Sequence, residues 1–152
     1  MRQPPKVFIV EDDQLLASAL SMLVETLGYS VNGVADSAVA AVNGVLKLQP
    51  EIVIMDVNLQ AGGSGLDAAR AIRLERDVPI IFYTAYSDQG FRDQAAALRH
   101  TQIVQKPASD DVISEALMLA SAGEGLGMPR ASGRIGRFAV ISESRRARLP
   151  VR

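Results

Sequence analysis

The stretch "KVFIVEDDQLL", Lys6 to Leu16, joins the features that decide the fold. Its apolar run VFIV is typical of a strand that is buried on both faces. Three consecutive carboxylates, Glu11, Asp12 and Asp13, follow this run, and a segment with helical leucine spacing follows them. Neighbouring carboxylates disfavour one another's ionisation. The stretch therefore predicts a strand, a helix and a nearby positive charge or cation at the turn between them.

The same succession of an apolar run and a helical segment recurs along the chain. Strands are predicted at 6–10, 29–34, 51–55, 79–84 and 101–104. Helices are predicted from about 16 to 27, where Gly28 is a C-cap, and at 37–48, 66–76, 88–98 and 109–122. Apolar strands separated by helices predict a parallel sheet covered on both faces, which is a doubly wound (βα)5 arrangement of the α/β class. The fifth strand is the least hydrophobic and is expected at an edge of the sheet.

Composition sets the frame for function. The chain has 152 residues, of which 48% are hydrophobic and 22% are charged, as in an ordinary globular domain. It has no cysteine, which excludes disulfides and thiolate metal sites. The run VFIV is too short for the core of a signal peptide, and no stretch approaches the length of a membrane span. We therefore expect a cytoplasmic protein with no membrane partner.

Charge divides the chain into two parts. Residues 1–123 carry a net charge of −6, whereas residues 124–152 carry +5. We predict one domain over residues 1–122 and a flexible, basic, Gly- and Arg-rich tail over 123–152, too short for an output domain. The tail contains one short candidate strand, "FAVIS" at 138–142. Without interleaved aromatics or a recognition helix, nucleic-acid binding is the less favoured interpretation of its arginines.

Polar residues follow the predicted strands where a parallel sheet places its ligands, beyond the carboxyl ends. They are Glu11, Asp12, Asp13, Asp56, Thr84 and Lys106. Several carboxylates at one point suit Mg²⁺, which keeps part of its water shell. Beside such an ion, one carboxylate can act as a nucleophile toward phosphorus.

Each of these residues has a predicted role. Asp56 is the candidate nucleophile. Asp12 would bind Mg²⁺ directly and Glu11 through water, and the backbone carbonyl of Asn58 would add a ligand. Thr84 and Lys106 would hold phosphoryl oxygens.

In the segments VEDD, MDVNL, YTAYSD and QKP, in this order and spacing, the sequence resembles the receiver domains of two-component response regulators over about residues 6–122. The resemblance implies a flavodoxin-like three-layer sandwich with strand order 2-1-3-4-5. It implies phosphorylation of Asp56 by a phosphohistidine of a sensor histidine kinase or a histidine phosphotransfer protein. It matches Glu11 and Asp12 to the acid pair, Thr84 to the hydroxyl residue and Lys106 to the lysine. Output would then pass through binding to a downstream protein, and self-association of the phosphorylated form stays open.

Three positions depart from the usual receiver pattern. Gln60 replaces a proline in a loop that is one residue longer than the commonest form up to Gly65. Ile103 stands where many receivers have a switching aromatic, and "KPAS" lacks the phenylalanine that often follows the lysine-proline pair. The loop, the output switch and the start of the last helix are therefore the parts expected to differ.

Other interpretations compete with this one. Asp13 is best explained as a helix N-cap, and His100 as a surface residue. A haloacid-dehalogenase-like phosphatase would need an acid two residues after the nucleophile, where this chain has Asn58. A pseudo-receiver that binds partners without being phosphorylated is the main alternative. The order and placement of the polar residues at the strand ends favour the interpretation of the chain as a phosphoacceptor.

Overall fold

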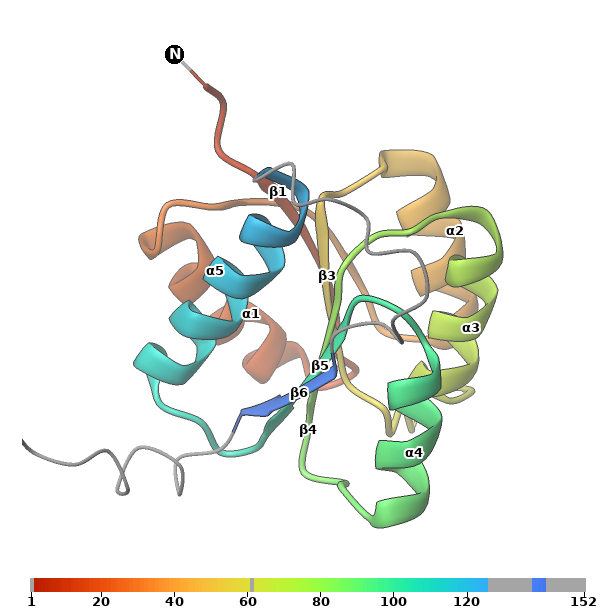
Figure 1. The fold of residues 1–152 in the computed structure, drawn as a ribbon. Coiled ribbons are helices and arrows are strands. Elements are labelled where there is room, and N and C mark those ends of the chain that lie inside the picture. The colour runs from red at the N-terminus through yellow and green to blue at the C-terminus, as the bar shows by residue number, and fades with distance from the viewer. Residues whose placement is uncertain (1, 61, 126–137, 142–152) are drawn as a thin grey trace, which may run out of the picture.

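The computed structural model describes residues 2–60, 62–125 and 138–141. One parallel sheet, in the order β2-β1-β3-β4-β5-β6, runs through the molecule (Figure 1). Its strands are β1 (Lys6–Val10), β2 (Ser30–Ala35), β3 (Ile52–Met55), β4 (Ile80–Thr84), β5 (Thr101–Gln105) and β6 (Phe138–Ile141). The helices are α1 (Gln14–Thr26), α2 (Ala38–Leu48), α3 (Gly65–Glu75), α4 (Gln89–Ala97) and α5 (Asp110–Gly125).

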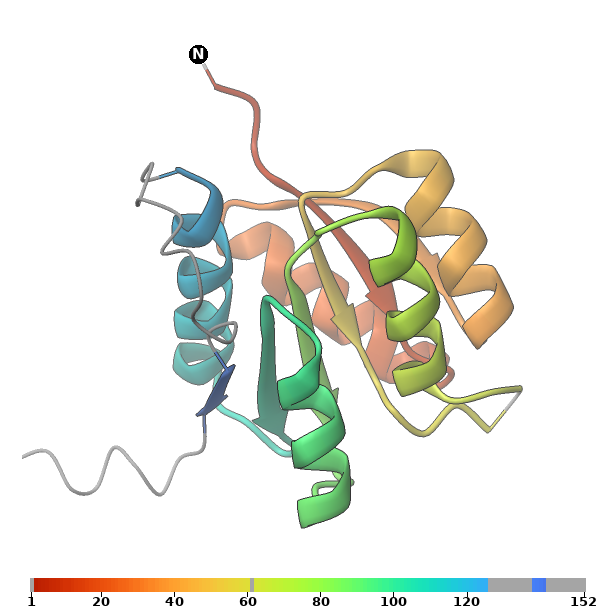
Figure 2. The ribbon, with the colours of Figure 1, turned by 45° about the vertical axis from the view of Figure 1, so that its right-hand side comes forward.

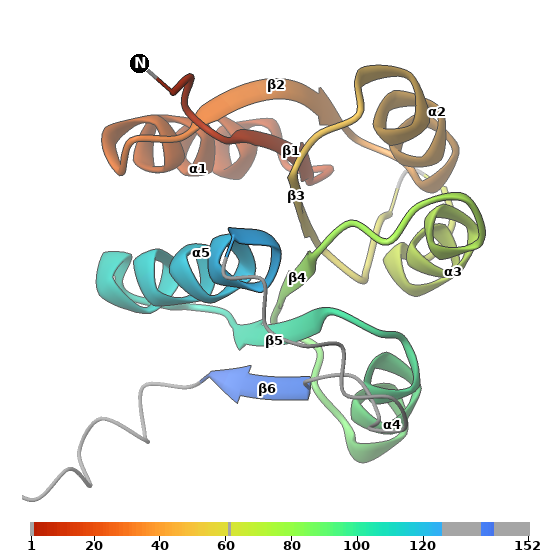
Figure 3. The same cartoon turned by 45° about the horizontal axis from the view of Figure 1, so that its top comes forward.

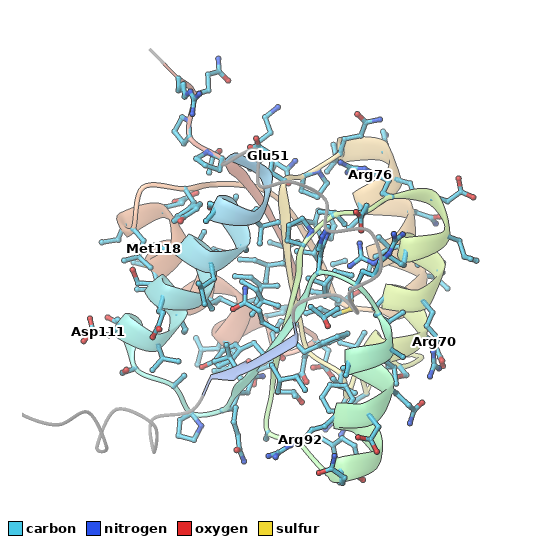
Figure 4. All side chains as sticks on the ribbon, in the orientation of Figure 1. Glu51, Arg70, Arg76, Arg92, Asp111 and Met118 are labelled. Carbon is cyan, nitrogen blue, oxygen red and sulfur yellow. The ribbon has the colours of Figure 1, made fainter. Side chains whose placement is uncertain are left out.

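Helices cover both faces of the sheet, which gives three layers. Figure 3 shows α1 and α5 on one face and α2, α3 and α4 on the other. Successive strand residues serve opposite faces. Phe8 accordingly packs in the core beneath α2 and α3, whereas Ile9 packs in the core beneath α1 and α5. Side chains fill both spaces between helices and sheet, and Met118 points outward from α5 (Figure 4).

Two glycines make room for the ring of Phe8. A Cβ atom at Gly33 of β2 or at Gly44 of α2 would lie 2.5 Å from a ring carbon of Phe8. Real Cβ contacts are never this short, so these two positions require glycine for α2 to approach the sheet as closely as it does.

The predicted (βα)5 fold and the strand order 2-1-3-4-5 are confirmed. One prediction is wrong: β5 is not the edge, because β6 pairs with it in parallel, with Ile103 opposite Val140. The low hydrophobicity of β5 predicted an edge strand because the prediction did not consider pairing with the apolar run at 138–141. Helix α5 also runs three residues past its predicted end, to Gly125. The division into a domain and a flexible tail stays a prediction, and residues 126–137 and 142–152 lie outside the described part.

Parallel pairing aligns the carboxyl ends of the strands at one rim, the lower side in Figure 1. Val10 at the end of β1 pairs with Met55 at the end of β3, and Thr84 of β4 pairs with Gln105 of β5. Figure 2 shows the loops that leave this rim toward α3 and α4. In the part of the chain that the structure describes, no helix is both long and apolar enough to cross a membrane.

Candidate functional site

The acid pair is fixed by the end of β1 and the start of α1. The backbone N–H of Glu11 donates to the carbonyl of Ala35, which continues the pairing with β2 for one residue. Asp13 is the N-cap of α1, and its Oδ1 accepts from the amides of Leu15 and Leu16 at 2.9 and 3.1 Å. The prediction that Asp13 is a cap is confirmed. Glu11 and Asp12 are thereby held at the rim, Glu11 buried and Asp12 half-buried.

Asp56 enters the same space from β3. Its N–H donates to the carbonyl of Val10 at 2.9 Å, so the chain leaves β3 directly beside the acid pair. Carboxylate oxygens of Glu11, Asp12 and Asp56 lie within 4.8 Å of one another. Three acids at this spacing offer a hard divalent cation the oxygen ligands that it prefers.

Lys106 connects the acids to β5. Its N–H donates to the carbonyl of Thr84, and its Nζ donates to Glu11 Oε2 at 2.6 Å and to Asp56 Oδ2 at 2.9 Å. The Lys106–Pro107 peptide bond is cis. Nζ also lies 5.2 Å from the ring centroid of Tyr83. The lysine thus supplies the positive charge that the carboxylates of the opening stretch require.

Burial and pairing oppose each other in the pKa values of this cluster. Burial raises the pKa of Glu11 above 4.5, and the hydrogen bond from Lys106 offsets only part of that rise. Burial lowers the pKa of Lys106, but the hydrogen bonds to Glu11 and Asp56 outweigh it, so the pKa lies above 10.5. With all groups ionised, three carboxylates and one ammonium leave a net charge of −2, which matches a divalent cation.

Thr84 and Asn58 complete the predicted set. Thr84 is buried at the end of β4, and its Oγ1 accepts from the N–H of Tyr86 at 3.1 Å, which leaves its hydroxyl proton available. Asn58 donates its N–H to Asp56 Oδ1 at 3.2 Å. The structure therefore brings the predicted metal and phosphoryl ligands to one open pocket of about 380 Å³, whereas Asp13 caps α1 and does not line it. The six predicted residues that line the pocket are Glu11, Asp12, Asp56, Asn58, Thr84 and Lys106.

Sequence reasoning missed four residues that line the pocket. The N–H of Gln60 donates to Asp12 Oδ2 at 2.8 Å, and Leu16, Ala85 and Tyr86 also line the pocket. The contact of Gln60 depends on the path of the loop and has no signature in the sequence. Tyr86 had a signal, its place two residues after Thr84, and Leu16 was assigned to the apolar stripe of α1.

Gly65, at the start of α3, packs against the backbone of Asp56. Its N–H donates to the carbonyl of Val57 at 2.8 Å, and a Cβ atom there would lie 2.0 Å from the carbonyl oxygen of Asp56. Only glycine allows α3 to begin this close to the backbone of Asp56.

A family model described as the response regulator receiver domain matches residues 7–118. The chain belongs to the response regulator receiver family. The matched region contains all the pocket residues described above, together with β1 from Val7 onward, β2 to β5 and the helices between them.

Individual relatives agree with this assignment. The phyllosphere-induced regulator PhyR of Methylorubrum extorquens is 39% identical over 85 residues, 55% of this chain and 32% of the relative. The transcriptional regulatory protein PdtaR of Mycobacterium tuberculosis is 32% identical over 117 residues, 77% of this chain and 57% of the relative. Among solved structures, the receiver domain of PhyR from Erythrobacter litoralis has a TM-score of 0.69 at 31% identity, with 78% of this chain and 90% of that one covered. The chain thus matches less than two thirds of the length of these curated relatives.

Proposed function

We propose that this receiver domain is a phosphoacceptor in which Asp56 takes a phosphoryl group with Mg²⁺ bound. The observation that supports this most is the double contact of Lys106, whose Nζ bonds Glu11 and Asp56 together beside Asp12. Such a cluster places an ammonium group and a cation site beside the carboxylate that would attack phosphorus.

Three carboxylates and one backbone carbonyl would coordinate the metal. Glu11, Asp12 and Asp56 would supply carboxylate oxygens, and Asn58 its backbone carbonyl. When bound, the ion neutralises the non-bridging oxygens of the incoming phosphoryl group. The net charge of the cluster and its oxygen-only donor set fit this ion.

Asp56 is the candidate nucleophile because of its place in the sheet, since its own oxygens accept hydrogen bonds from Asn58 and Lys106 just as those of its neighbours are engaged. It follows β3, which lies between β1 and β4, whereas Glu11 and Asp12 both follow β1. Asp56 lies between these acids and Thr84, on the wall of the pocket. Its oxygen would form the new O–P bond as the N–P bond of a phosphohistidine breaks, and the imidazole would leave with the electron pair and take up a proton.

After transfer, Thr84 and Lys106 would hold the phosphoryl oxygens. The hydroxyl of Thr84 would donate to one oxygen, and the ammonium of Lys106 would pair with another. A phosphoryl group adds charge and acceptor oxygens, so it would shift an existing equilibrium in the loops that follow β3 and β4. Output would pass to a downstream protein through this altered surface.

The phosphodonor would be a cytoplasmic sensor histidine kinase or histidine phosphotransfer protein. Helix α1 lies beside the pocket, and Leu15, Leu16 and Met22 on it are 81%, 49% and 70% exposed. Between Gln14 and Val24, α1 carries no charged residue. An apolar, uncharged helix face next to the reacting aspartate suits an amphipathic helix that carries the donor histidine.

One observation favours the alternative of a pseudo-receiver that is never phosphorylated. The N–H of Gln60 donates to Asp12 Oδ2, and this hydrogen bond takes up part of the acceptor capacity that Asp12 would offer a metal. A phosphatase of the haloacid-dehalogenase type is disfavoured, because Asn58 cannot serve as its general acid.

The test is intact-mass spectrometry of the full chain after incubation with phosphoramidate or acetyl phosphate and Mg²⁺. We expect a single phosphoryl adduct in the wild type and in Asp67→Asn, a control acid that is exposed on α3. Asp56→Asn should carry none. An unmodified wild type, or an adduct that persists in Asp56→Asn, would contradict the proposal, and steady release of phosphate from a monoester would favour the phosphatase.

A further inference from the structure

Strand β6 differs from the other strands in how it is attached. It has four residues, Phe138–Ile141, and among the described elements it packs extensively against β5 alone. Strands β1, β3 and β4 each have a neighbouring strand on both sides and helices above and below. A short strand that is held along one side contributes little buried area, so its pairing is weak compared with that of the interior strands.

The topology also sets β6 apart from the other strands. Helices α3 and α4 lie on one face while the chain advances from β3 to β4 to β5, and α5 lies on the opposite face with α1. A right-handed crossover through the face of α5 would lead back toward β4, as α1 leads from β1 to β2. Strand β6 lies on the other side of β5. The usual crossover rule therefore does not place β6, which is joined to α5 through residues 126–137.

The edge of β5 that β6 occupies is suited to accept a strand. Thr101–Gln105 contains no charge and no proline, and its pairing with β6 runs without a register shift over four residues. The opposite edge, β2, is interrupted by a shift in its register with β1 between Val7 and Phe8. Sheet edges without charges, prolines or bulges bind extended segments readily.

We propose that the outer edge of β5 is a strand-binding site for an extended, uncharged, apolar segment of a partner protein, and that Phe138–Ile141 is an exchangeable occupant from the same chain. The chemistry of the partner follows from the occupant: about four consecutive apolar residues, such as FAVI, that run parallel to β5. The site is distinct from the pocket around Asp56 and does not depend on its phosphorylation.

One backbone amide reports on the occupancy of this edge. The N–H of Ile80 donates to His100, and the N–H of Lys106 donates to Thr84, so even-numbered residues of β5 direct their polar groups toward β4. N–H groups of successive residues in a strand point to opposite sides. The N–H of Ile103 therefore points toward β6, whereas that of Val104 points toward β4 and serves as an internal control.

The experiment uses the full chain with Ala139→Pro and Ile141→Pro, which interrupt β6 by removing two N–H groups. A matched control carries Ala147→Pro and Val151→Pro, beyond β6. The probe is a fluorescent peptide of sequence RFAVIS, residues 137–142, and a second peptide with prolines at the positions of 139 and 141 controls for non-specific binding. Residue-resolved hydrogen exchange and fluorescence anisotropy are the measurements.

We expect the Ile103 amide to exchange faster in the β6 variant than in the wild type and the matched control, with Val104 unchanged. The peptide should restore the protection of Ile103 in the variant. It should bind the variant at least about tenfold more tightly than the wild type, because in the wild type the chain's own β6 competes at high effective concentration. Excess peptide should still displace β6 in the wild type.

Several results would overturn the proposal. Equal Ile103 exchange in wild type and variant would mean that β6 does not cover the edge. A peptide that fails to bind, binds both proteins equally, or leaves Ile103 unprotected would remove the strand-binding site, and a wild type that never exchanges β6 would remove its exchangeability. Protection of Ile103 that depends on protein concentration would assign the occupant to a second copy of the chain.

Discussion

At the scale of single residues, the pocket depends on a glycine as much as on its charged groups. Gly65 gives the backbone of Asp56 the space that any Cβ atom would fill. We expect Gly65→Ala to lower the free energy of unfolding by about 1–3 kcal/mol through overpacking and to slow adduct formation at Asp56. Urea unfolding and the mass assay measure the two effects. Gly123→Ala is the control, because a Cβ atom there meets nothing within 4 Å, and equal behaviour of the two variants would refute the close-contact argument.

Glu11 should make stability depend on pH in a defined direction. Burial raises its pKa above 4.5, so the folded protein binds this proton more tightly than the unfolded chain does. The stabilisation that comes from protonating Glu11 is complete below 4.5 and is lost as the pH rises through the raised folded pKa. In the presence of a chelator, the stability of the wild type relative to Glu11→Gln should therefore increase from pH 7.5 to 4.5. Urea unfolding across this range is the measurement, and a difference that stays constant or grows with pH would contradict the assigned burial.

At the scale of elements, phosphorylation by a kinase should depend on the exposed face of α1, whereas phosphorylation by a small molecule should not. We expect Met22→Glu to reduce phosphotransfer from a partner kinase about tenfold or more, because it places a charge on the apolar face of α1. Acetyl phosphate needs no docking surface, so its adduct should form at the wild-type rate. Leu74→Glu is the matched control, since Leu74 is 87% exposed on α3. If Met22→Glu and Leu74→Glu impair transfer from the kinase equally, α1 is not the docking helix.

Sequence patterns predicted the elements well because the fold repeats one unit. The apolar runs and leucine spacings locate β1 to β4 and their helices to within a residue or two. The polar residues predicted at the ends of the first, third, fourth and fifth strands include five that line the pocket: Glu11, Asp12, Asp56, Thr84 and Lys106. Prediction failed where position depends on the three-dimensional path of the chain. The N–H of Gln60 reaches Asp12 across 48 positions of sequence, and a backbone contact leaves no trace in residue type. Strand β6 was missed as a partner of β5 because four apolar residues in a Gly- and Arg-rich tail specify no neighbour.

At the scale of the whole molecule, metal binding and stability should be linked. A cation that binds the folded cluster of acids but not the unfolded chain stabilises the fold, by about 1.4 kcal/mol when its concentration is ten times its dissociation constant. We expect millimolar Mg²⁺ to raise the midpoint of thermal unfolding of the wild type. Asp12→Asn should remove most of the shift, whereas Asp67→Asn should retain it. An unchanged midpoint in the wild type would indicate a pocket closed to metal, as in a pseudo-receiver.

The parallel sheet also places the start of β1 and the acid cluster at opposite ends of the molecule. Residues 2–5 enter β1 at the end of the sheet that is opposite the acid cluster (Figure 1). A tether or fluorophore attached before Lys6 would therefore sit a full strand length away from Asp56. Chains anchored to a sensor surface in this way would present their reactive pockets outward, in one orientation, to whatever protein flows past.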